Sequence, residues 1–295
     1  MSVIIVNHNA GDYLCRAVES LDDGRVRDIV VVDNASRDAS LDRLRERHGT
    51  DGRLRLLRLE RNVGFAATCN RGLALAEGEL LLFLNPDCRL YPGALDAMCR
   101  VVERDLRTAM AGPRLVNPDG SEQRGGRRDI PNPWQIFCMT LLFHRLMPNH
   151  PRFRGINQHG QPLPDGPVEV QAISGACMLV RRFAIQDVGQ WDEGYFLHCE
   201  DLDFSMSLRR KGWKILFVPD ARIVHDKGGC SHCRPIFVEW HKHLGMIRFY
   251  RKFFRAQYPG VLMWLVVAGV WLRFLGIAAY HTGHLLELKM GLVRE

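Results

Sequence analysis

The first hundred residues alternate short apolar runs with longer stretches that mix apolar and polar positions. The apolar runs have the length of buried strands, and the mixed stretches have the length of helices. Such an alternation predicts an α/β fold in which a mostly parallel sheet carries helices on both faces. Strands are expected at residues 3–6, 29–32, 54–59 and 80–84, and helices at 14–21, 41–47, 65–76 and 94–104.

The pattern weakens in the middle of the chain. Residues 117–167 are rich in Pro, Gly and Arg and have no period, which predicts long loops over the sheet. Strand signals return at residues 168–173 and 177–180. Residues 201–211 then predict a helix, and Gly212 is a suitable residue to end it.

The last sixty residues differ from the rest. Residues 234–255 contain six Lys or Arg and one Glu, and they predict a basic amphipathic helix. Two apolar runs follow, at 261–272 and 274–280, with Arg273 between them. We therefore expect a domain at residues 1–233 and a C-terminal helical segment at residues 234–295. The cations that share one face of the first helix are Arg248, Arg251, Lys252 and Arg255.

The two apolar runs suggest contact with a membrane. Twelve residues are too few to span about 30 Å of hydrocarbon, and joining both runs would place Arg273 near the bilayer centre. We expect the segment to lie on the anionic, cytoplasmic face of the inner (plasma) membrane as a peripheral element. Two alternatives stay open: a buried helical hairpin or dimer interface, and a transmembrane anchor. The oligomeric state does not follow from the sequence.

Composition excludes several classes of protein. A chain of 295 residues with 46% hydrophobic and 25% charged residues is a folded protein, neither disordered nor fibrous. The net charge of +7 would suit nucleic-acid binding, but the cations gather beside an apolar segment and no recognised motif is present, so no nucleic-acid partner is expected. Nine cysteines without regular spacing, and no N-terminal leader pattern, predict reduced cytosolic thiols.

The polar residues that follow the predicted strands are the first candidates for chemistry. There is no G-x-G-x-x-G after the first strand and no Walker A sequence, which excludes the common dinucleotide and P-loop sites. Ligands bind beyond the carboxyl ends of parallel strands, where amide and carboxylate oxygens can accept from a nucleoside or hold a divalent cation. For any one of these residues taken alone, a turn or a helix cap is the commoner role of Asn and Asp. The candidates are Asn7, Asn9, Asp33, Asn34, Asn62, Asn85 and Asp87.

A second group of candidates lies further along the chain. Glu200 and Asp201 open the predicted helix, where they stabilise its dipole or supply a general base and an orienting carboxylate. His225 follows an apolar run and is either structural or a metal ligand. Cys230 and Cys233 form half of a zinc-site pattern, which His241 and His243 could complete, although nothing in the spacing requires it.

In their order along the chain, these motifs resemble the inverting family-2 glycosyltransferases of the GT-A fold, particularly the rhamnosyltransferase-like bacterial branch. The resemblance extends from Val3 to about Ser231, most of the chain. Each motif is short, but the ordered set is specific. The motifs are residues 3–9 (VIIVNHN), 31–36 (VVDNAS), 62–66 (NVGFA) with Asn70 and Gly72, 84–87 (LNPD), 174–178 (SGACM), 192–196 (DEGYF), 200–203 (EDLD) and His225.

The resemblance implies a role for each candidate residue. Asp201 matches the catalytic base, and Glu200 lies beside it. Asp87 would be the second acid of the D-x-D motif and would bind Mn²⁺ or Mg²⁺ with His225, while Asn85 replaces the usual first Asp and contributes no charge. The residues implied for the nucleotide pocket are Asp33, as the nucleobase contact, with Asn9, Asn62 and Gly64.

The reaction implied is metal-dependent, inverting transfer of one sugar from dTDP-rhamnose or a UDP-sugar. The chain lacks the Q-x-x-R-W motif of processive members, which favours single-sugar transfer. With the membrane segment, the expected acceptor is a glycan linked to a polyprenyl diphosphate, in cell-surface polysaccharide biosynthesis. A nucleotidyltransferase would need a phosphate loop after the first strand, and a non-catalytic membrane scaffold would not need the retained acids and His225.

Overall fold

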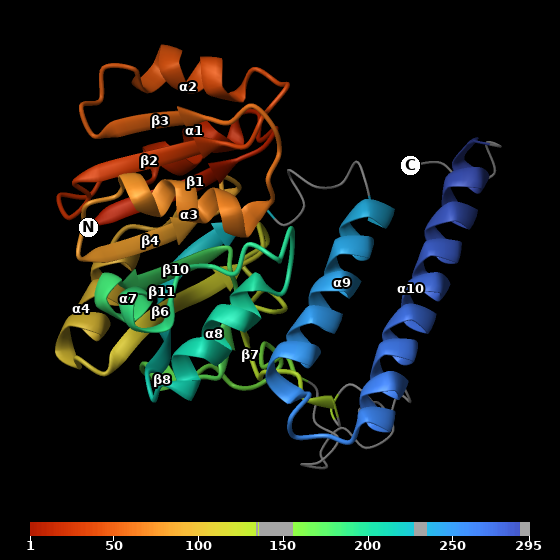
Figure 1. Cartoon of the computed structure of the whole chain (residues 1–295). Coiled ribbons are helices and arrows are strands. Elements are labelled where there is room, and N and C mark those ends of the chain that lie inside the picture. The colour runs from red at the N-terminus through yellow and green to blue at the C-terminus, as the bar shows by residue number, and fades with distance from the viewer. Residues whose placement is uncertain (134, 136–155, 227–234, 290–295) are drawn as a thin grey trace.

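The computed structural model describes residues 1–133, 135, 156–226 and 235–289, with only the helical backbone described at 284–289. A nine-stranded sheet forms its centre, with the strand order β3-β2-β1-β4-β10-β6-β11-β5 and with β8 paired to β11 (Figure 1). β7 and β9 form a separate two-stranded sheet. The strands are β1 (Ser2–Asn7), β2 (Asp28–Asp33), β3 (Leu54–Arg58), β4 (Leu80–Leu84), β5 (Cys88–Leu90), β6 (Thr108–Val116), β7 (Arg127–Arg128), β8 (Val168–Glu169), β9 (Ala172–Ile173), β10 (Cys177–Arg181) and β11 (Lys214–His225).

Strand directions bring the candidate residues to one edge. β1 pairs in parallel with β2 and β4, and β2 pairs in parallel with β3, so their carboxyl ends meet. β10 runs antiparallel between β4 and β6, and β11 runs parallel to β6 and antiparallel to β5. The predicted, mostly parallel sheet is therefore confirmed, with an antiparallel insertion.

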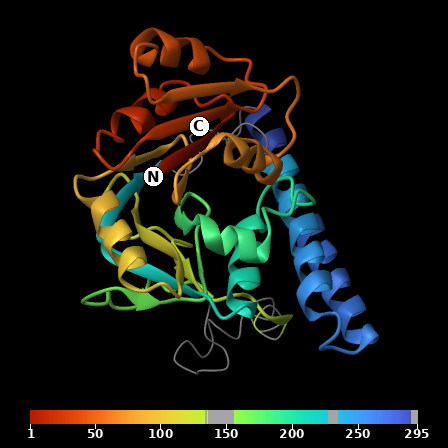
Figure 2. The ribbon, with the colours of Figure 1, turned by 60° about the vertical axis from the view of Figure 1, so that its left-hand side comes forward.

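Helices cover both faces of the sheet, as predicted (Figures 1 and 2). Because side chains alternate along a strand, Val3 and Ile5 pack with α1, α2 and α4, whereas Ile4 and Val6 pack with α3, α7 and α8. The described free cysteines Cys15, Cys69, Cys99, Cys177 and Cys199 are buried. The helices are α1 (Tyr13–Glu19), α2 (Ser40–His48), α3 (Phe65–Leu75), α4 (Ala94–Arg104), α7 (Arg182–Val188), α8 (Glu200–Arg210), α9 (Pro235–Phe254) and α10 (Gly260–Lys289).

The C-terminal segment forms two adjacent antiparallel helices, with α9 between α8 and α10 (Figures 1 and 2). Both apolar runs and Arg273 lie in the single helix α10. Its Gly260–Gly283 part has a mean hydropathy of 2.1, so it is long and apolar enough to cross a membrane. Among its side chains up to residue 283, those of Met263, Val270 and Phe274 are buried.

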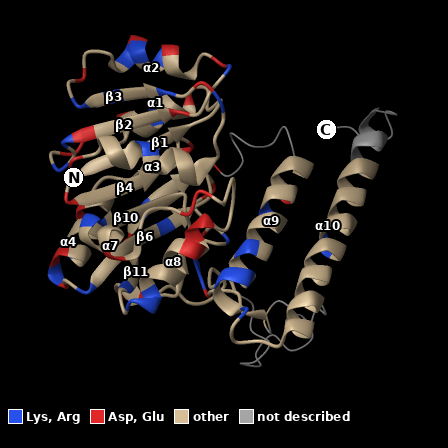
Figure 3. Ribbon diagram, in the orientation of Figure 1, with Lys and Arg blue, Asp and Glu red and all other residues tan. Residues whose placement is uncertain are grey.

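Part of the predicted basic face of α9 contacts the sheet domain. Arg248 Nη2 lies 2.7 Å from Asp192 Oδ1, and Lys252 Nζ contacts Asp192 Oδ2 at 2.9 Å and Asp203 Oδ1 at 2.8 Å. The basic end of α9 thus faces the acidic start of α8 (Figure 3). All four cations of the predicted basic face are exposed, and Arg248 and Lys252 in addition form ion pairs with carboxylates of the sheet domain.

Candidate active site

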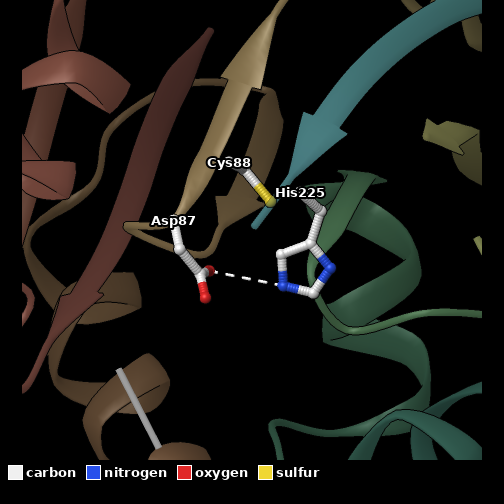
Figure 4. A group of neighbouring side chains, drawn as sticks. All are labelled: Asp87, Cys88 and His225. Carbon is white, nitrogen blue, oxygen red and sulfur yellow. Dashed lines mark ion pairs between the residues drawn. The ribbon is translucent and has the colours of Figure 1, made fainter. Parts of the chain in front are cut away.

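Asp87 and His225, which are far apart in the sequence, lie side by side. The turn after β4 leads into β5, whose antiparallel pairing with β11 sets Cys88 opposite His225. This register brings Asp87 Oδ1 to 3.3 Å from His225 Nε2, and both residues are buried (Figure 4). The expected proximity of these two residues is thus confirmed.

The donor atoms of this pair fit a hard divalent cation. Asp87 Oδ1 is buried and accepts no hydrogen bond within the described part of the chain. A carboxylate oxygen and an imidazole nitrogen that face each other are suitable ligands for Mn²⁺, and the oxygen also suits Mg²⁺. Cys88 Sγ lies within 4.8 Å of both atoms, but its thiol donates to the Ala176 carbonyl at 3.4 Å and is a soft ligand.

Asp201 lies at the start of α8, where its carboxylate is held by three donors. Oδ1 accepts from the Leu202 amide at 2.8 Å, Oδ2 accepts from the Gly175 amide at 3.0 Å, and the Arg128 guanidinium donates to Oδ2 as well. His198 and Cys199, which precede the helix, both have left-handed backbones, at φ 68° and 69°. Such strain in consecutive non-glycine residues is uncommon outside functional sites.

Glu200 occupies a different environment from its neighbour. It is enclosed by protein, and its Oε2 atom has no hydrogen-bond partner among the described residues. Burial, with a smaller contribution from the Asp201 charge, raises the pKa of Glu200 to about 8. Glu200 is therefore protonated at neutral pH, and Asp201 is the better candidate for a base.

Residues 174–176 connect Asp201, the candidate base, to the Asp87–His225 pair. The Gly175 amide donates to Asp201, and the next residue, Ala176, accepts from the Asn85 amide at 2.8 Å and from the Cys88 thiol. Because adjacent residues are about 3.8 Å apart, a base and a candidate metal site share one short segment. The sequence motif SGACM therefore has a structural role at the centre of the site.

The remaining predicted residues gather at the ends of β1 and β2. Asn62 Oδ1 accepts from the Asn34 side chain and from the Gly64 amide, both at 2.9 Å, and Asn9 Oδ1 accepts from the Arg37 amide at 2.7 Å. His8 also belongs to this cluster, since its Nδ1 lies 2.9 Å from the Asn34 carbonyl and its Nε2 lies 3.3 Å from Asn62 Nδ2.

Asp33 is placed differently from the other residues of this edge. Its side chain is fully buried, and it accepts from Asn7 Nδ2 at 2.7 Å and from the Ser36 amide at 3.2 Å. Arg58 Nε lies 3.6 Å from its Oδ2. The carboxylate thus organises the loop after β2, and its expected contact with a nucleobase remains a prediction.

Two residues of the site carry no strong signal in the sequence. Gln123 and Arg128 lie in the aperiodic region, and they contact His225 and Asp201 respectively. Only proximity to a predicted ligand or base singles them out, and that proximity requires the fold.

The possible zinc site receives no support from the described residues. Cys230 and Cys233 lie outside them. His241 stacks on Phe196 with ring centroids 4.4 Å apart, and His243 Nδ1 lies 2.6 Å from the Glu239 carbonyl. Both histidines therefore have other partners.

Comparisons with known proteins agree with this geometry. The family model described as Glycosyl transferase family 2 matches residues 2–189, and that described as Glycosyl transferase family group 2 matches residues 149–286. A curated relative from Mycobacterium tuberculosis, N-acetylglucosaminyl-diphospho-decaprenol L-rhamnosyltransferase, is 30% identical over 241 residues, which cover 77% of this chain and 76% of the relative.

Solved structures show the same fold at low sequence identity. GalNAc-T7 with UDP, GalNAc and Mn²⁺ superposes with a TM-score of 0.59 at 20% identity, covering 95% of this chain and 56% of that one. The mannosyltransferase PcManGT from Pyrobaculum calidifontis with GDP-Man and Mn²⁺ gives 0.58 at 15% identity, covering 97% and 80%. With the family model matching more than half of its length, the chain belongs to glycosyl transferase family 2 and is a glycosyltransferase of the GT-A fold.

Proposed function

We propose that this glycosyltransferase transfers one sugar, with inversion, from a nucleotide-sugar donor to a glycan carried on a polyprenyl diphosphate. The observation that carries the proposal is the junction at residues 174–176, which joins a base candidate to a carboxylate–imidazole pair. The rhamnosyltransferase relative favours dTDP-rhamnose over a UDP-sugar as donor and a lipid-linked acceptor.

Each residue of the site would have a separate role in the reaction. Asp87 and His225 would hold Mn²⁺ or Mg²⁺, which supplies positive charge beside the departing diphosphate. Asp201, oriented by Arg128 and Gly175, accepts the proton of an acceptor hydroxyl. The hydroxyl oxygen bonds to the anomeric carbon as the bond to the nucleoside diphosphate breaks on the opposite face, which inverts the centre.

The nucleotide would lie along the edge formed by His8, Asn9, Asn62 and Gly64. Amide groups and an imidazole can donate to and accept from a base and ribose without charge. Asn85, on the turn that leads from β4 to Asp87, would contact the donor as well. Asp33 supports the edge from beneath through its bonds to the β2 loop.

A transfer assay tests the reaction. Purified protein is incubated with a polyprenyl-diphosphate-linked N-acetylglucosamine, Mn²⁺ or EDTA, and either dTDP-rhamnose or a UDP-sugar. We expect one donor to react, EDTA to stop the reaction, and product NMR to show the inverted anomer. Asp87→Asn should be inactive, while Asp220→Asn, an exposed acid on the strand that carries His225, should retain activity. Metal-independent transfer, or none with any donor, would overturn the proposal.

We further propose that α10 holds the enzyme on the cytoplasmic membrane surface. Its exposed residues between positions 261 and 280 are apolar apart from Arg273, and Val261, Trp264 and Leu272 are 73%, 75% and 69% exposed. Arg273 points toward α9, with Nη1 3.3 Å from His243 Nε2. Because α9 is ion-paired to the sheet domain, a helix docked along its length would keep the active-site domain beside the membrane.

Flotation with anionic vesicles tests this arrangement. Trp264→Glu combined with Leu265→Glu should abolish vesicle binding, and Leu106→Glu, which changes an equally exposed leucine of the sheet domain, should not. If the wild type is a dimer without lipid and the double variant is a monomer, the exposed face of α10 is instead a dimer interface. Retention in the membrane after carbonate extraction would indicate a spanning helix.

A further inference from the structure

The side chain of Gln123 has one possible orientation. It lies in the loop after β6, is 4% exposed, and its Nε2 donates to the His225 carbonyl at 3.0 Å and to Asn117 Oδ1 at 2.9 Å. A carbonyl oxygen accepts hydrogen bonds and donates none. The NH₂ group of Gln123 must therefore face these two atoms, and its Oε1 atom must face the opposite side.

A chain of hydrogen bonds supports this orientation from outside. Asn117 Nδ2 donates to Ser121 Oγ at 2.9 Å, and Ser121 Oγ donates to Asp119 Oδ1 at 2.6 Å. A carboxylate can only accept, so the direction of each bond is set from Asp119 inward. The backbone amide of Gln123 donates to the Leu115 carbonyl at 2.8 Å, and this bond holds the loop against β6.

The orientation of Gln123 decides which ring nitrogen of neutral His225 carries the proton. Gln123 Oε1 lies 2.6 Å from His225 Nδ1, and an oxygen without hydrogen can only accept there. In the neutral imidazole the proton is therefore on Nδ1, and Nε2 carries the lone pair. That lone pair faces Asp87 Oδ1, 3.3 Å away.

We propose that Gln123 is a positioning residue that locks His225 in the Nδ1–H tautomer and so presents Nε2 as a metal ligand. The assignment rests on the metal site of the proposed function. In the other tautomer an Nε2–H group would donate to Asp87, and both atoms would be unavailable to a cation. Gln123 opposes this by offering the ring a closer acceptor on its far side, at 2.6 Å from Nδ1 against 3.3 Å between Nε2 and Asp87.

The experiment uses the full-length chain and two readouts. Nitrogen-15 NMR of the metal-free protein reports which ring nitrogen of His225 is protonated, with the signals assigned by their loss in His225→Gln. Electron paramagnetic resonance measures the affinity for Mn²⁺ alone. Gln123→Met removes the acceptor at similar length, Gln123→Glu keeps an acceptor oxygen, and Gln158→Met is the same substitution in a glutamine outside the chain of bonds.

We expect an Nδ1–H ring in the wild type, in Gln123→Glu and in Gln158→Met, and an Nε2–H ring in Gln123→Met. Mn²⁺ affinity should fall about 10–100-fold in Gln123→Met, the range for loss of a residue that supports a ligand. An Nε2–H ring in the wild type would overturn the inference even if the variant fails to fold, as would an unchanged tautomer in Gln123→Met. A wild type that binds no Mn²⁺ but has the Nδ1–H ring would refute the metal site while supporting the tautomer assignment.

Discussion

Substitution of Gly64 by alanine tests how the edge proposed to bind the nucleotide is joined to the segment that leads to Asp201, the proposed catalytic base. Gly64 precedes α3 with φ 88° and ψ 167°, a conformation that is essentially restricted to glycine. An added Cβ would lie 2.7 Å from the Phe196 carbonyl oxygen and 2.9 Å from Phe196 Cα. The same oxygen accepts from the Phe65 amide at 2.8 Å, so neither segment can shift alone.

The chain provides a matched control for the backbone cost. Gly189 has φ 92° and ψ 169°, and a Cβ there would meet nothing within 4 Å. Both variants therefore lose about 1–3 kcal/mol from the unfavourable backbone, and both gain equally from the stiffer unfolded chain. Only Gly64→Ala adds an overlap with backbone, for which overpacked sites cost about 1–3 kcal/mol.

Urea denaturation followed by circular dichroism measures the difference. We expect Gly64→Ala to be less stable than Gly189→Ala by about 1–3 kcal/mol, and to show a lower kcat because Phe196 lies in the segment before Asp201. Equal free energies of unfolding, within about 0.5 kcal/mol, would refute the reasoning. That result would mean that the segment around Phe196 can move away from the added Cβ without a loss of stability.

Three further predictions concern the acids around α8. Asp201→Asn should lower the transfer rate by at least about 10²–10⁴-fold while leaving donor binding nearly unchanged, because an amide cannot accept the proton; an active Asp201→Asn with an inactive Glu200→Gln would reverse their roles. Because the pKa of Glu200 is raised, its carboxyl group loses its proton near pH 4.5 in the unfolded chain and near pH 8 in the folded chain. The free energy of unfolding of the wild type should therefore fall as the pH rises from 4.5 to 8. Denaturation of Glu200→Gln at pH 5 and pH 8 should show a smaller fall, and parallel losses would contradict the assignment. Lys252→Met should destabilise the protein by no more than about 1 kcal/mol, because the lysine is partly exposed. The loss should still be larger than that of the control Arg251→Met. Equal melting temperatures of the two variants at low salt would indicate that the ion pairs of Lys252 do not hold α9.

The local elements could be predicted from the sequence because their signals are local. The apolar runs at 3–6, 29–32 and 80–84 are strands, and the mixed stretch at 94–104 is α4 with the same bounds. A run of β-branched and leucine side chains favours a strand wherever the chain later places it. The strand-end rule then identified the polar residues of the edge before any contact was known.

Strands that depend on distant partners were harder to predict. β5 has three residues, and it exists because β11 pairs with it from more than a hundred residues away. Residues 168–173 carry one signal but form two strands, since β8 joins β11 and β9 joins β7. Short segments have too few side chains to show a period, so only their partners determine their conformation.

The sequence alone therefore supplied the candidate ligands and base, Asp87, His225, Glu200 and Asp201, because residue type limits what chemistry a side chain can perform. The tertiary structure decided which of them meet: the β5–β11 register joined Asp87 to His225, and three hydrogen-bond donors reach Asp201 while Glu200 Oε2 has no partner among the described residues. It also turned Arg248 and Lys252 toward Asp192 and brought Gln123 to His225. Charge attraction and hydrogen-bond direction act over a few ångströms of space, and distance along the chain does not record them.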